Sequence, residues 1–403
     1  MAMPRNLISL IDGTMVSASR SGGYNSYSNI FELACLLQLS DRSADGAPQI
    51  VFYTSGISSQ PDNWNPWNLM TGNSIKSQIV DQYTNICANF DFAGAGRGTP
   101  DRIFLFGFSR GAMAIRALAG LIAEFGLLHP RDIRHLPVLL DRWDKSLGIG
   151  SVPDHIDLLP VEIEFVGLFD SVMGGIERLR FFNPIRFRSS KLPARVKHGV
   201  HILAIDENRS LFKPKPWGGA SEARDASGYK CADRWLRQIW MPGVHADVGG
   251  TGDPTWGRAS LLAMTYYLDR LTRLRLDTDW LREKEAKLRI SIDDGPVFIR
   301  PHSGPMSRFL RRPGGAAEQA EVRHPITDRL RDVNFGGVDH CDWYERVVRS
   351  RFDTIGVDEE LAQYFAAILD VGGREAVLTA QVIDPDAEGE SARIRPVQVE
   401  AKR

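Results

Sequence analysis

Short apolar runs alternate with segments of helical periodicity through the first two thirds of the chain. A run of about four to eight apolar residues between turn residues is typical of a buried strand, whereas apolar residues three or four apart predict a helix. The predicted strands cover residues 7–11, 49–54, 103–108, 161–169, 200–205 and 238–241. The predicted helices cover residues 30–39, 74–90, 110–125 and 258–271. Strands that alternate with helices predict an α/β fold, with a mostly parallel sheet and helices on both faces.

The pattern changes at about residue 275 of the 403 residues. Residues 1–275 carry the alternation and are predicted to form one large domain. Residues 276–403 are broken by charged, Gly and Pro residues, with one helix predicted near 359–369 and a polar tail from about residue 384. We expect this C-terminal extension to pack on or beside the sheet.

Composition and charge narrow the class of protein. The chain is 43% apolar and 25% charged, as expected of a globular protein, and its formal net charge is −1. With so little net charge, no overall field attracts nucleic acid or an anionic membrane. The four cysteines, at positions 35, 87, 231 and 341, form no Cys-x-x-Cys pair, which suits a reducing, cytoplasmic compartment. We expect neither a signal peptide nor a membrane-spanning helix, because the apolar runs are too short.

The strongest chemical signal lies between the third predicted strand and the helix that follows it. Residues 107–111 read Gly-Phe-Ser-Arg-Gly and fit the pattern Gly-x-Ser-x-Gly. Its setting, directly after an apolar strand and before a periodic helix, is that of a nucleophile elbow. Side chains at the two glycine positions would collide with the neighbouring strand and helix. Ser109 is therefore the predicted nucleophile, and the alternative interpretation is a serine that only caps the helix.

A serine nucleophile requires a base, and the base requires an acid, in the chain order Ser, Asp, His. Asp170 ends a predicted strand, and His245 lies in a predicted loop just after another short strand. Asp206, after the strand at 200–205, is an alternative acid. Asp247 is close to His245 in sequence and is expected to brace the loop. The domain of residues 1–275 is on this interpretation the catalytic domain.

Ester hydrolysis by this route also requires an oxyanion hole. One backbone N–H group is expected from Arg110, the residue after the nucleophile. The second is expected from Gly13 or Thr14, because residues 12–14 read Asp-Gly-Thr and end the first strand. No cofactor and no metal ion is needed for this chemistry.

Five motifs in this order carry a family resemblance. They are Asp-Gly-Thr at 12–14, Gly-Phe-Ser-Arg-Gly-Ala at 107–112, Gly-Leu-Phe-Asp-Ser-Val at 167–172, Ala-Ile-Asp-Glu-Asn-Arg at 204–209 and Met-Pro-Gly-Val-His-Ala-Asp-Val-Gly-Gly at 241–250. Together they resemble the bacterial α/β-hydrolase family that includes the catalytic domain of type VI secretion phospholipase effectors. The resemblance implies a triad of Ser109, Asp170 and His245, and favours Asp170 over Asp206.

The resemblance also bears on substrate and partners. It implies a phospholipid acyl ester as substrate, export by a signal-independent secretion system, and an immunity protein as a partner of such an effector. Three departures from the family pattern surround the expected pocket mouth: Val16 in place of Asn, Ser-Gly-Ile-Ser at 55–58, and Gly-Gly-Thr-Gly-Asp at 249–253. These departures concern the identity of the substrate more than the triad.

Two segments rich in aromatic residues are candidates for a lid that controls substrate access. Residues 60–70 contain Trp64 and Trp67, and residues 178–188 combine arginines with Phe181 and Phe182. Such mixtures suit transient contact with a membrane surface, and the alternative is a loop whose aromatic side chains pack inward.

Three other functions remain open on the sequence alone. The first is a carboxylesterase acting on small water-soluble esters. The second is a metal-dependent phosphoesterase, in which Asp12, His245 and Asp247 would hold a divalent ion. The third is a non-catalytic member of the family that only binds its ligand. The phosphoesterase leaves the nucleophile elbow unexplained, and a complete apparent triad argues against a binding module.

Overall fold

The computed structural model describes most of the first 293 residues and several segments beyond them. The described residues are 3–14, 16, 27–39, 45–57, 73–145, 147–174, 191–218, 229, 231–293, 297–299, 311, 313, 321–335, 355–370 and 378–382.

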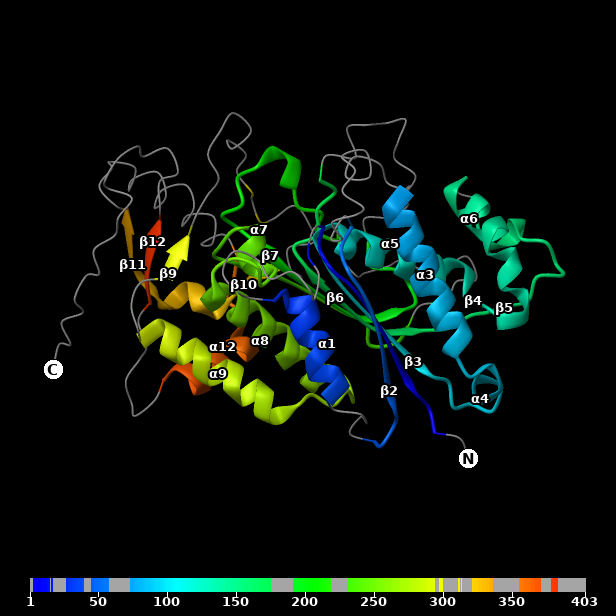
Figure 1. The fold of residues 1–403 in the computed structure, drawn as a ribbon, viewed down its shortest axis with the longest axis horizontal. Coiled ribbons are helices and arrows are strands. Elements are labelled where there is room, and N and C mark those ends of the chain that lie inside the picture. The colour runs from blue at the N-terminus through cyan, green and yellow to red at the C-terminus, as the bar shows by residue number, and fades with distance from the viewer. Residues whose placement is uncertain are drawn as a thin grey trace.

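Seven parallel strands form the central sheet (Figure 1), in the order β10-β8-β7-β6-β3-β1-β2. They are β1 (Asn6–Ile11), β2 (Gln49–Thr54), β3 (Arg102–Phe108), β6 (Ile163–Phe169), β7 (Val196–Ala204), β8 (Trp235–Met241) and β10 (Glu321–Arg323). The six predicted strands are all present, although β7 and β8 begin three to four residues earlier than their apolar patterns suggested. The predicted α/β fold with a mostly parallel sheet is confirmed.

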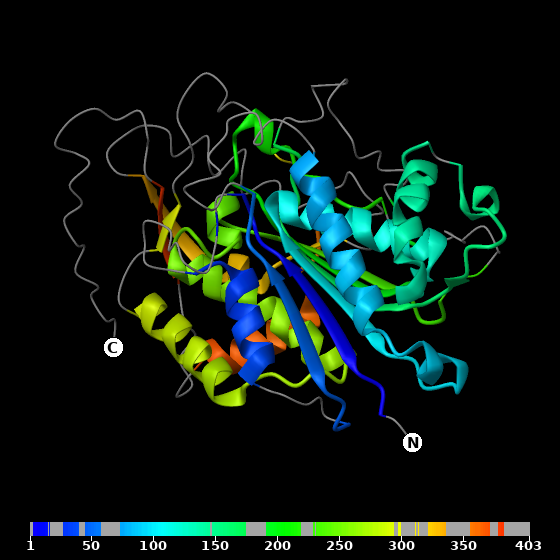
Figure 2. The same ribbon diagram turned by 45° about the vertical axis from the view of Figure 1, so that its right-hand side comes forward.

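Helices cover both faces of the sheet, as the two views in Figures 1 and 2 show. The helices α1 (Asn29–Leu39), α8 (Pro254–Leu271), α9 (Thr278–Asp293) and α12 (Glu359–Leu369) belong to one hydrophobic core, and α3 (Asn73–Asn89), α5 (Ser109–Phe125) and α6 (Leu136–Asp144) belong to the other. Successive strand residues point to opposite faces. In β1, Leu7 and Ile11 enter the α3–α5 core, whereas Ile8 and Leu10 enter the α1–α8 core.

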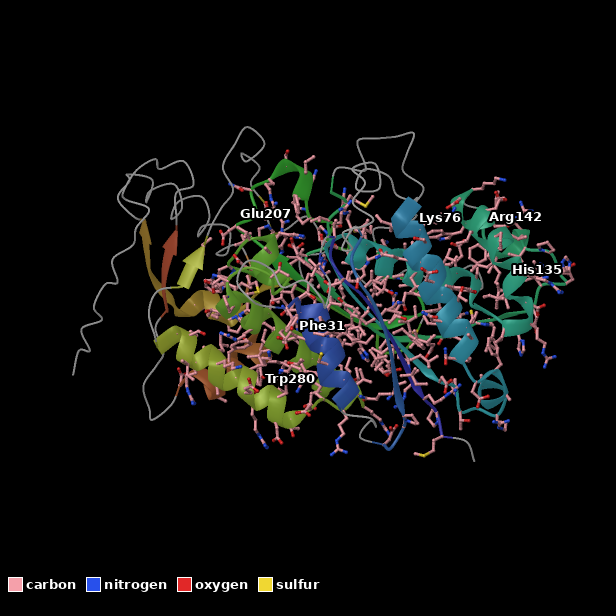
Figure 3. All side chains as sticks on the ribbon, viewed as in Figure 1. Phe31, Lys76, His135, Arg142, Glu207 and Trp280 are labelled. Atoms are coloured by element: carbon pink, nitrogen blue, oxygen red, sulfur yellow. The ribbon has the colours of Figure 1, made fainter. Side chains whose placement is uncertain are left out.

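Both layers are filled with side chains (Figure 3). Phe31 of α1 and Trp280 of α9 lie in the layer on the α8 side of the sheet. On the other side, α3 and α6 are joined at the surface by an ion pair between Lys76 Nζ and Asp144 Oδ2 at 2.5 Å. Within the part of the chain that the structure describes, no helix is long and apolar enough to cross a membrane.

Some of the described residues after residue 275 join the main sheet or pack beside it. The short strand β10 pairs in parallel with β8 at the sheet edge, and α9 and α12 pack beside α8. A second parallel sheet has the order β11-β12-β9, formed by β11 (Leu330–Phe335), β12 (Leu378–Val382) and β9 (Val297–Ile299). Only α12 was predicted in this region, with the same bounds.

The remaining elements are short. They are α4 (Phe92–Gly96), α7 (His245–Val248), the antiparallel pair β4 (Leu127–Leu128) and β5 (Leu158–Leu159), and the 3-10 helices at Pro130–His135, Ile149–Ser151, Ser210–Phe212 and Pro325–Arg329. The carboxyl ends of β1, β3, β6, β7 and β8 meet at one edge of the sheet, which is where ligands bind in folds of this kind.

Candidate active site

Ser109 sits at a strained turn between β3 and α5. Its φ angle is 59°, in the left-handed region that non-glycine residues rarely adopt. The turn is possible because its neighbours have no side chain. A Cβ atom on Gly107 would lie 2.6 Å from Ala112 Cα, and one on Gly111 would lie 2.4 Å from Ile11 O. The sequence pattern thus produces the local geometry of a nucleophile elbow.

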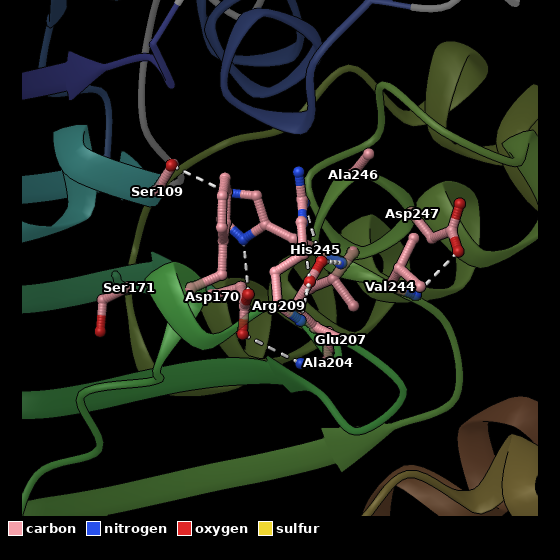
Figure 4. A network of polar contacts seen from close by, with 12 residues as sticks. Ser109, Asp170, Ser171, Ala204, Glu207, Arg209, Val244, His245, Ala246 and Asp247 are labelled. Atoms are coloured by element: carbon pink, nitrogen blue, oxygen red, sulfur yellow. Dashed lines mark hydrogen bonds and ion pairs between the residues drawn. The ribbon is translucent and has the colours of Figure 1, made fainter. Parts of the chain in front are cut away.

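The structure brings Ser109, His245 and Asp170 together, as Figure 4 shows. His245 Nε2 lies 2.8 Å from Ser109 Oγ, and His245 Nδ1 lies 2.5 Å from Asp170 Oδ2. Asp170 directly follows β6 and has a positive φ angle of 39°. His245 was expected in a loop, but it is the first residue of the one-turn helix α7, which begins after a turn at Gly243.

Asp170 is completely buried, and its surroundings favour the ionised carboxylate. Burial opposes ionisation, but the charge of Arg311 and the hydrogen bond with His245 outweigh it and hold the pKa of Asp170 well below its usual range. Arg311 donates to both carboxylate oxygens, at 2.6 and 2.9 Å. Arg311 was not predicted from the sequence; it lies in the C-terminal extension, outside any strand or helix.

Asp206 and Asp247 hold the backbone that leads into His245. Asp206 Oδ2 accepts a hydrogen bond from Gly243 N at 2.8 Å, and Asp247 Oδ2 accepts one from Val244 N at 2.8 Å. Asp170, and not Asp206, is therefore the carboxylate that contacts the imidazole of His245. The expected bracing role of Asp247 agrees with its contacts, and burial raises the pKa of Asp247 to about 7.

A third carboxylate, Glu207, completes this backbone support and was not singled out from the sequence. Glu207 Oε2 accepts a hydrogen bond from His245 N at 3.3 Å. Arg209 donates to Glu207 through Nε and Nη2, each at 2.8 Å. Although burial opposes ionisation, these bonds and the charge of Arg209 lower the pKa of Glu207. The motif at 204–209 thus carries one residue that holds Gly243 and another that holds His245.

Aromatic rings enclose the imidazole of His245. The Phe108 ring stacks on it with centroids 4.8 Å apart, and the Phe212 ring meets it edge-on at 4.9 Å. Glycines make room for Phe108, because a Cβ atom on Gly249 would lie 2.1 Å from the ring and one on Gly13 would lie 2.5 Å from it. Two aromatic side chains thereby restrict the position of the imidazole.

The loop after β1 lies beside the elbow, where the second oxyanion donor was predicted. A Cβ atom on Gly13 would lie 3.3 Å from Ser109 Cβ, so the loop passes close to the nucleophile. The N–H group of Gly13 donates to Asp12 Oδ1 at 2.7 Å, which argues against Gly13 as the donor and leaves Thr14 as the candidate. Thr14 Oγ1 accepts a hydrogen bond from Arg110 Nε at 2.5 Å. Arg110 itself lies in the first turn of α5, whose leading N–H groups have no acceptor within the helix.

The structure does not bring Asp12, His245 and Asp247 together as a metal site. Asp12 Oδ2 accepts hydrogen bonds from Ser28 Oγ at 2.5 Å and from Tyr53 OH at 2.9 Å, and burial raises the pKa of Asp12 to about 6. Across the described ranges, no three His, Cys, Asp or Glu side chains cluster in a way that could hold a metal ion. The predicted access residues Trp64, Trp67, Phe181 and Phe182 lie outside the described residues.

The sheet, the strained serine after β3 and the placement of the three site residues define an α/β-hydrolase fold. Residues 5–270 match the model of the family described as T6SS, Phospholipase effector Tle1-like, catalytic domain. The chain belongs to this family.

The individual relatives and solved structures have low sequence identity to this chain. An uncharacterized protein of Saccharomyces cerevisiae is 29% identical over 239 residues, which cover 52% of this chain and 32% of the relative. A crystal structure of an uncharacterized protein from Pseudomonas aeruginosa is 17% identical, with a TM-score of 0.41, and the match covers 71% of this chain and 48% of that one. The structure of the Tle1 effector bound to the VgrG spike of the type VI secretion system is 22% identical, with a TM-score of 0.33, covering 62% and 51%. The chain thus spans about a third of its curated relative.

Proposed function

We propose that this protein hydrolyses the carboxylic esters of phospholipids, with Ser109 as nucleophile, His245 as base and Asp170 as acid. Ser109 Oγ attacks the acyl carbonyl carbon while His245 Nε2 takes the hydroxyl proton. The proton then passes to the departing alkoxide, so that the lysophospholipid leaves and an acyl-enzyme remains. Water attacks this ester by the same route, which releases the fatty acid and restores Ser109.

The observation that carries the proposal is the continuous contact from Ser109 Oγ through the imidazole to Asp170 Oδ2, at 2.8 and 2.5 Å. The hydrogen bond at Nδ1 fixes the imidazole tautomer, so that Nε2 is free to accept a proton. The positive φ angle of Ser109 is a second support, because such strain is retained where function requires it. Backbone N–H groups of Arg110 and Thr14 are the proposed oxyanion donors.

An active-site probe tests the serine mechanism directly. A fluorophosphonate should label the wild-type chain once and should not label Ser109→Ala. Ser151→Ala is a matched control, because Ser151 belongs to a separate 3-10 helix, Ile149–Ser151, and its Oγ donates to Gly148 O. Equal labelling of wild type and Ser109→Ala would contradict the proposed nucleophile.

Membership of a family described by a phospholipase effector supports a phospholipid as substrate. We expect release of fatty acid from phospholipid micelles and vesicles, abolished in Ser109→Ala and retained in Ser151→Ala. The rate should rise as the phospholipid passes its critical micelle concentration. A preference for short water-soluble esters, without any rise at that concentration, would instead identify a small-molecule carboxylesterase and leave the serine mechanism intact.

The same family description supports a role outside the producing cell, as an effector that a type VI system exports. One of the solved structures holds the Tle1 effector on a VgrG spike, and a comparable spike is the partner we propose for the protein that carries this chain. Production in a bacterial host, with and without an added export signal, tests the toxic role. Growth arrest that disappears in Ser109→Ala is expected. A protein partner that relieves the arrest would be an immunity protein. Normal growth of the host, both with and without the export signal, would contradict the toxic role.

A further inference from the structure

Arg311 is a buried cation that lies outside the part of the chain matched by the family model. Its side chain has no measurable exposure and contacts the equally buried carboxylate of Asp170. The two terminal nitrogens approach the two carboxylate oxygens separately, Nη1 to Oδ1 at 2.6 Å and Nη2 to Oδ2 at 2.9 Å. A two-pronged contact of this kind fixes the plane of a carboxylate as well as its charge.

The same guanidinium joins three segments of the site. Nη1 also donates to Ala204 O, at the end of β7, and Nη2 donates to Phe212 O, each at 2.6 Å. Phe212 is the residue whose ring meets the imidazole of His245. Arg311 therefore bonds to the acid and to the backbone of a residue that confines the base.

We propose that Arg311 is a positioning residue of the hydrolytic site, which keeps Asp170 ionised and turned toward His245, so that the machinery is completed by the chain beyond residue 270. This inference rests on the proposed function. Its physical basis is the low dielectric around a fully buried carboxylate, where a charged donor is far more effective than a neutral one. Once Asp170 is held by Arg311 and by the backbone N–H of Ala204, its Oδ2 remains directed at Nδ1.

The groups that face Asp170 decide what removal of Arg311 should do. They are Arg311 itself, His245 on α7, and His201 on β7, whose pKa burial lowers to about 3, so that it adds no charge near neutral pH. Glu207 is anionic and lies on the backbone side of His245. Without Arg311, burial raises the pKa of Asp170, opposed among its described contacts by the hydrogen bond and the charge of His245.

The test compares Arg311→Met and Arg311→Lys with wild type in the full chain. Arg311→Met should lower kcat on the order of 10- to 100-fold with little change in KM. This is the range found in metal enzymes when a residue that orients a metal-binding side chain is lost. As pH is lowered, the variant should lose activity at a higher pH than wild type does, because the Asp170 carboxylate is protonated at a higher pH. Arg311→Lys keeps the charge without the fork and should lie in between. Arg270→Met is the control, since Arg270 pairs only with Glu360 at the surface among its described contacts.

Two further measurements separate positioning from a general effect on folding. In an Asp170→Asn background, Arg311→Met should cause no additional loss of kcat. In Arg311→Gly, guanidinium ion at concentrations too low to unfold the protein should restore activity, whereas uncharged urea should not. Guanidinium rescue applies even if Arg311→Met folds poorly.

The outcomes distinguish the inference from the proposed function. Wild-type kcat and pH profile in Arg311→Met, or additive losses with Asp170→Asn, would overturn the role of Arg311 alone. Hydrolysis that persists in Ser109→Ala would overturn the proposed function. Loss of activity in Ser109→Ala together with rescue of Arg311→Gly by guanidinium is the result expected if both hold.

Discussion

Gly249→Ala should disable the site by moving one ring. Gly249 ends the one-turn helix that begins at His245, and a Cβ atom there would lie 2.1, 2.3 and 2.5 Å from three atoms of the Phe108 ring. Ordinary contacts of a Cβ atom begin at 3.4 Å. The ring must therefore move by roughly 1 Å, because close packing leaves no void to absorb the added methyl group.

Phe108 has little room to retreat. A Cβ atom on Gly13 would already lie within 2.5 Å of the same ring, so the β1 loop blocks one direction. The ring also stacks on the imidazole of His245, so its displacement would move the base. A shift of about 1 Å in a catalytic group costs about 10²-fold in rate. Overpacking of this kind lowers the free energy of unfolding by about 1–3 kcal/mol.

The assay is the second-order rate of fluorophosphonate labelling, measured beside urea unfolding. Gly249→Ala should react about 100-fold more slowly than wild type while remaining folded. Gly120→Ala is the matched control, because a Cβ atom on Gly120 meets nothing within 4 Å. As an interior position of α5, it should gain about 0.5–1 kcal/mol of stability and keep the wild-type labelling rate. A wild-type labelling rate in Gly249→Ala would refute the packing argument.

Three other perturbations test the remaining contacts. Asp170→Asn should lower kcat on the order of 10⁴-fold. Asp206→Asn weakens only the hydrogen bond from Gly243 N and should lower kcat far less. Steady-state kinetics of both variants decides between the two acids. Burial raises the pKa of Asp247 from 3.8 to about 7. Between these two pH values the carboxyl group of Asp247 is protonated in the folded state and ionised in the unfolded chain. The free energy of unfolding should therefore fall as pH rises from about 4 to about 7, less steeply in Asp247→Asn, as urea unfolding across that range would reveal. Thr14→Val removes the acceptor for Arg110 Nε and should lower the free energy of unfolding, measured by thermal unfolding, by about 1–3 kcal/mol. Thr14→Ser keeps the acceptor and should behave like wild type.

The main sheet could be predicted because its strands have a strong local signal. The strand β3 is apolar along almost its whole length, and β1 is apolar except at its first residue and Ser9, as expected of strands covered on both faces. Elements with a weaker signal were missed. In α9, Leu288 and Ile292 are buried but most of the remaining residues are charged or polar, so the apolar stripe is narrow. β10 has three residues, Glu321 to Arg323, and its position depends on pairing with β8. No local sequence pattern predicts this pairing.

The same distinction separates the site residues that were predicted from Arg311, which was missed. Ser109, Asp170 and His245 each follow a strand of one parallel sheet, so their strands end at the same edge and topology brings them together. Arg311 belongs to no strand or helix, and a buried arginine looks in sequence like any exposed one. Its place beside Asp170 is known only from the tertiary contacts of its side chain. A boundary near residue 275 therefore separates two patterns in the sequence, but residues from both sides of it, Asp170 and Arg311, are in direct contact in the folded chain.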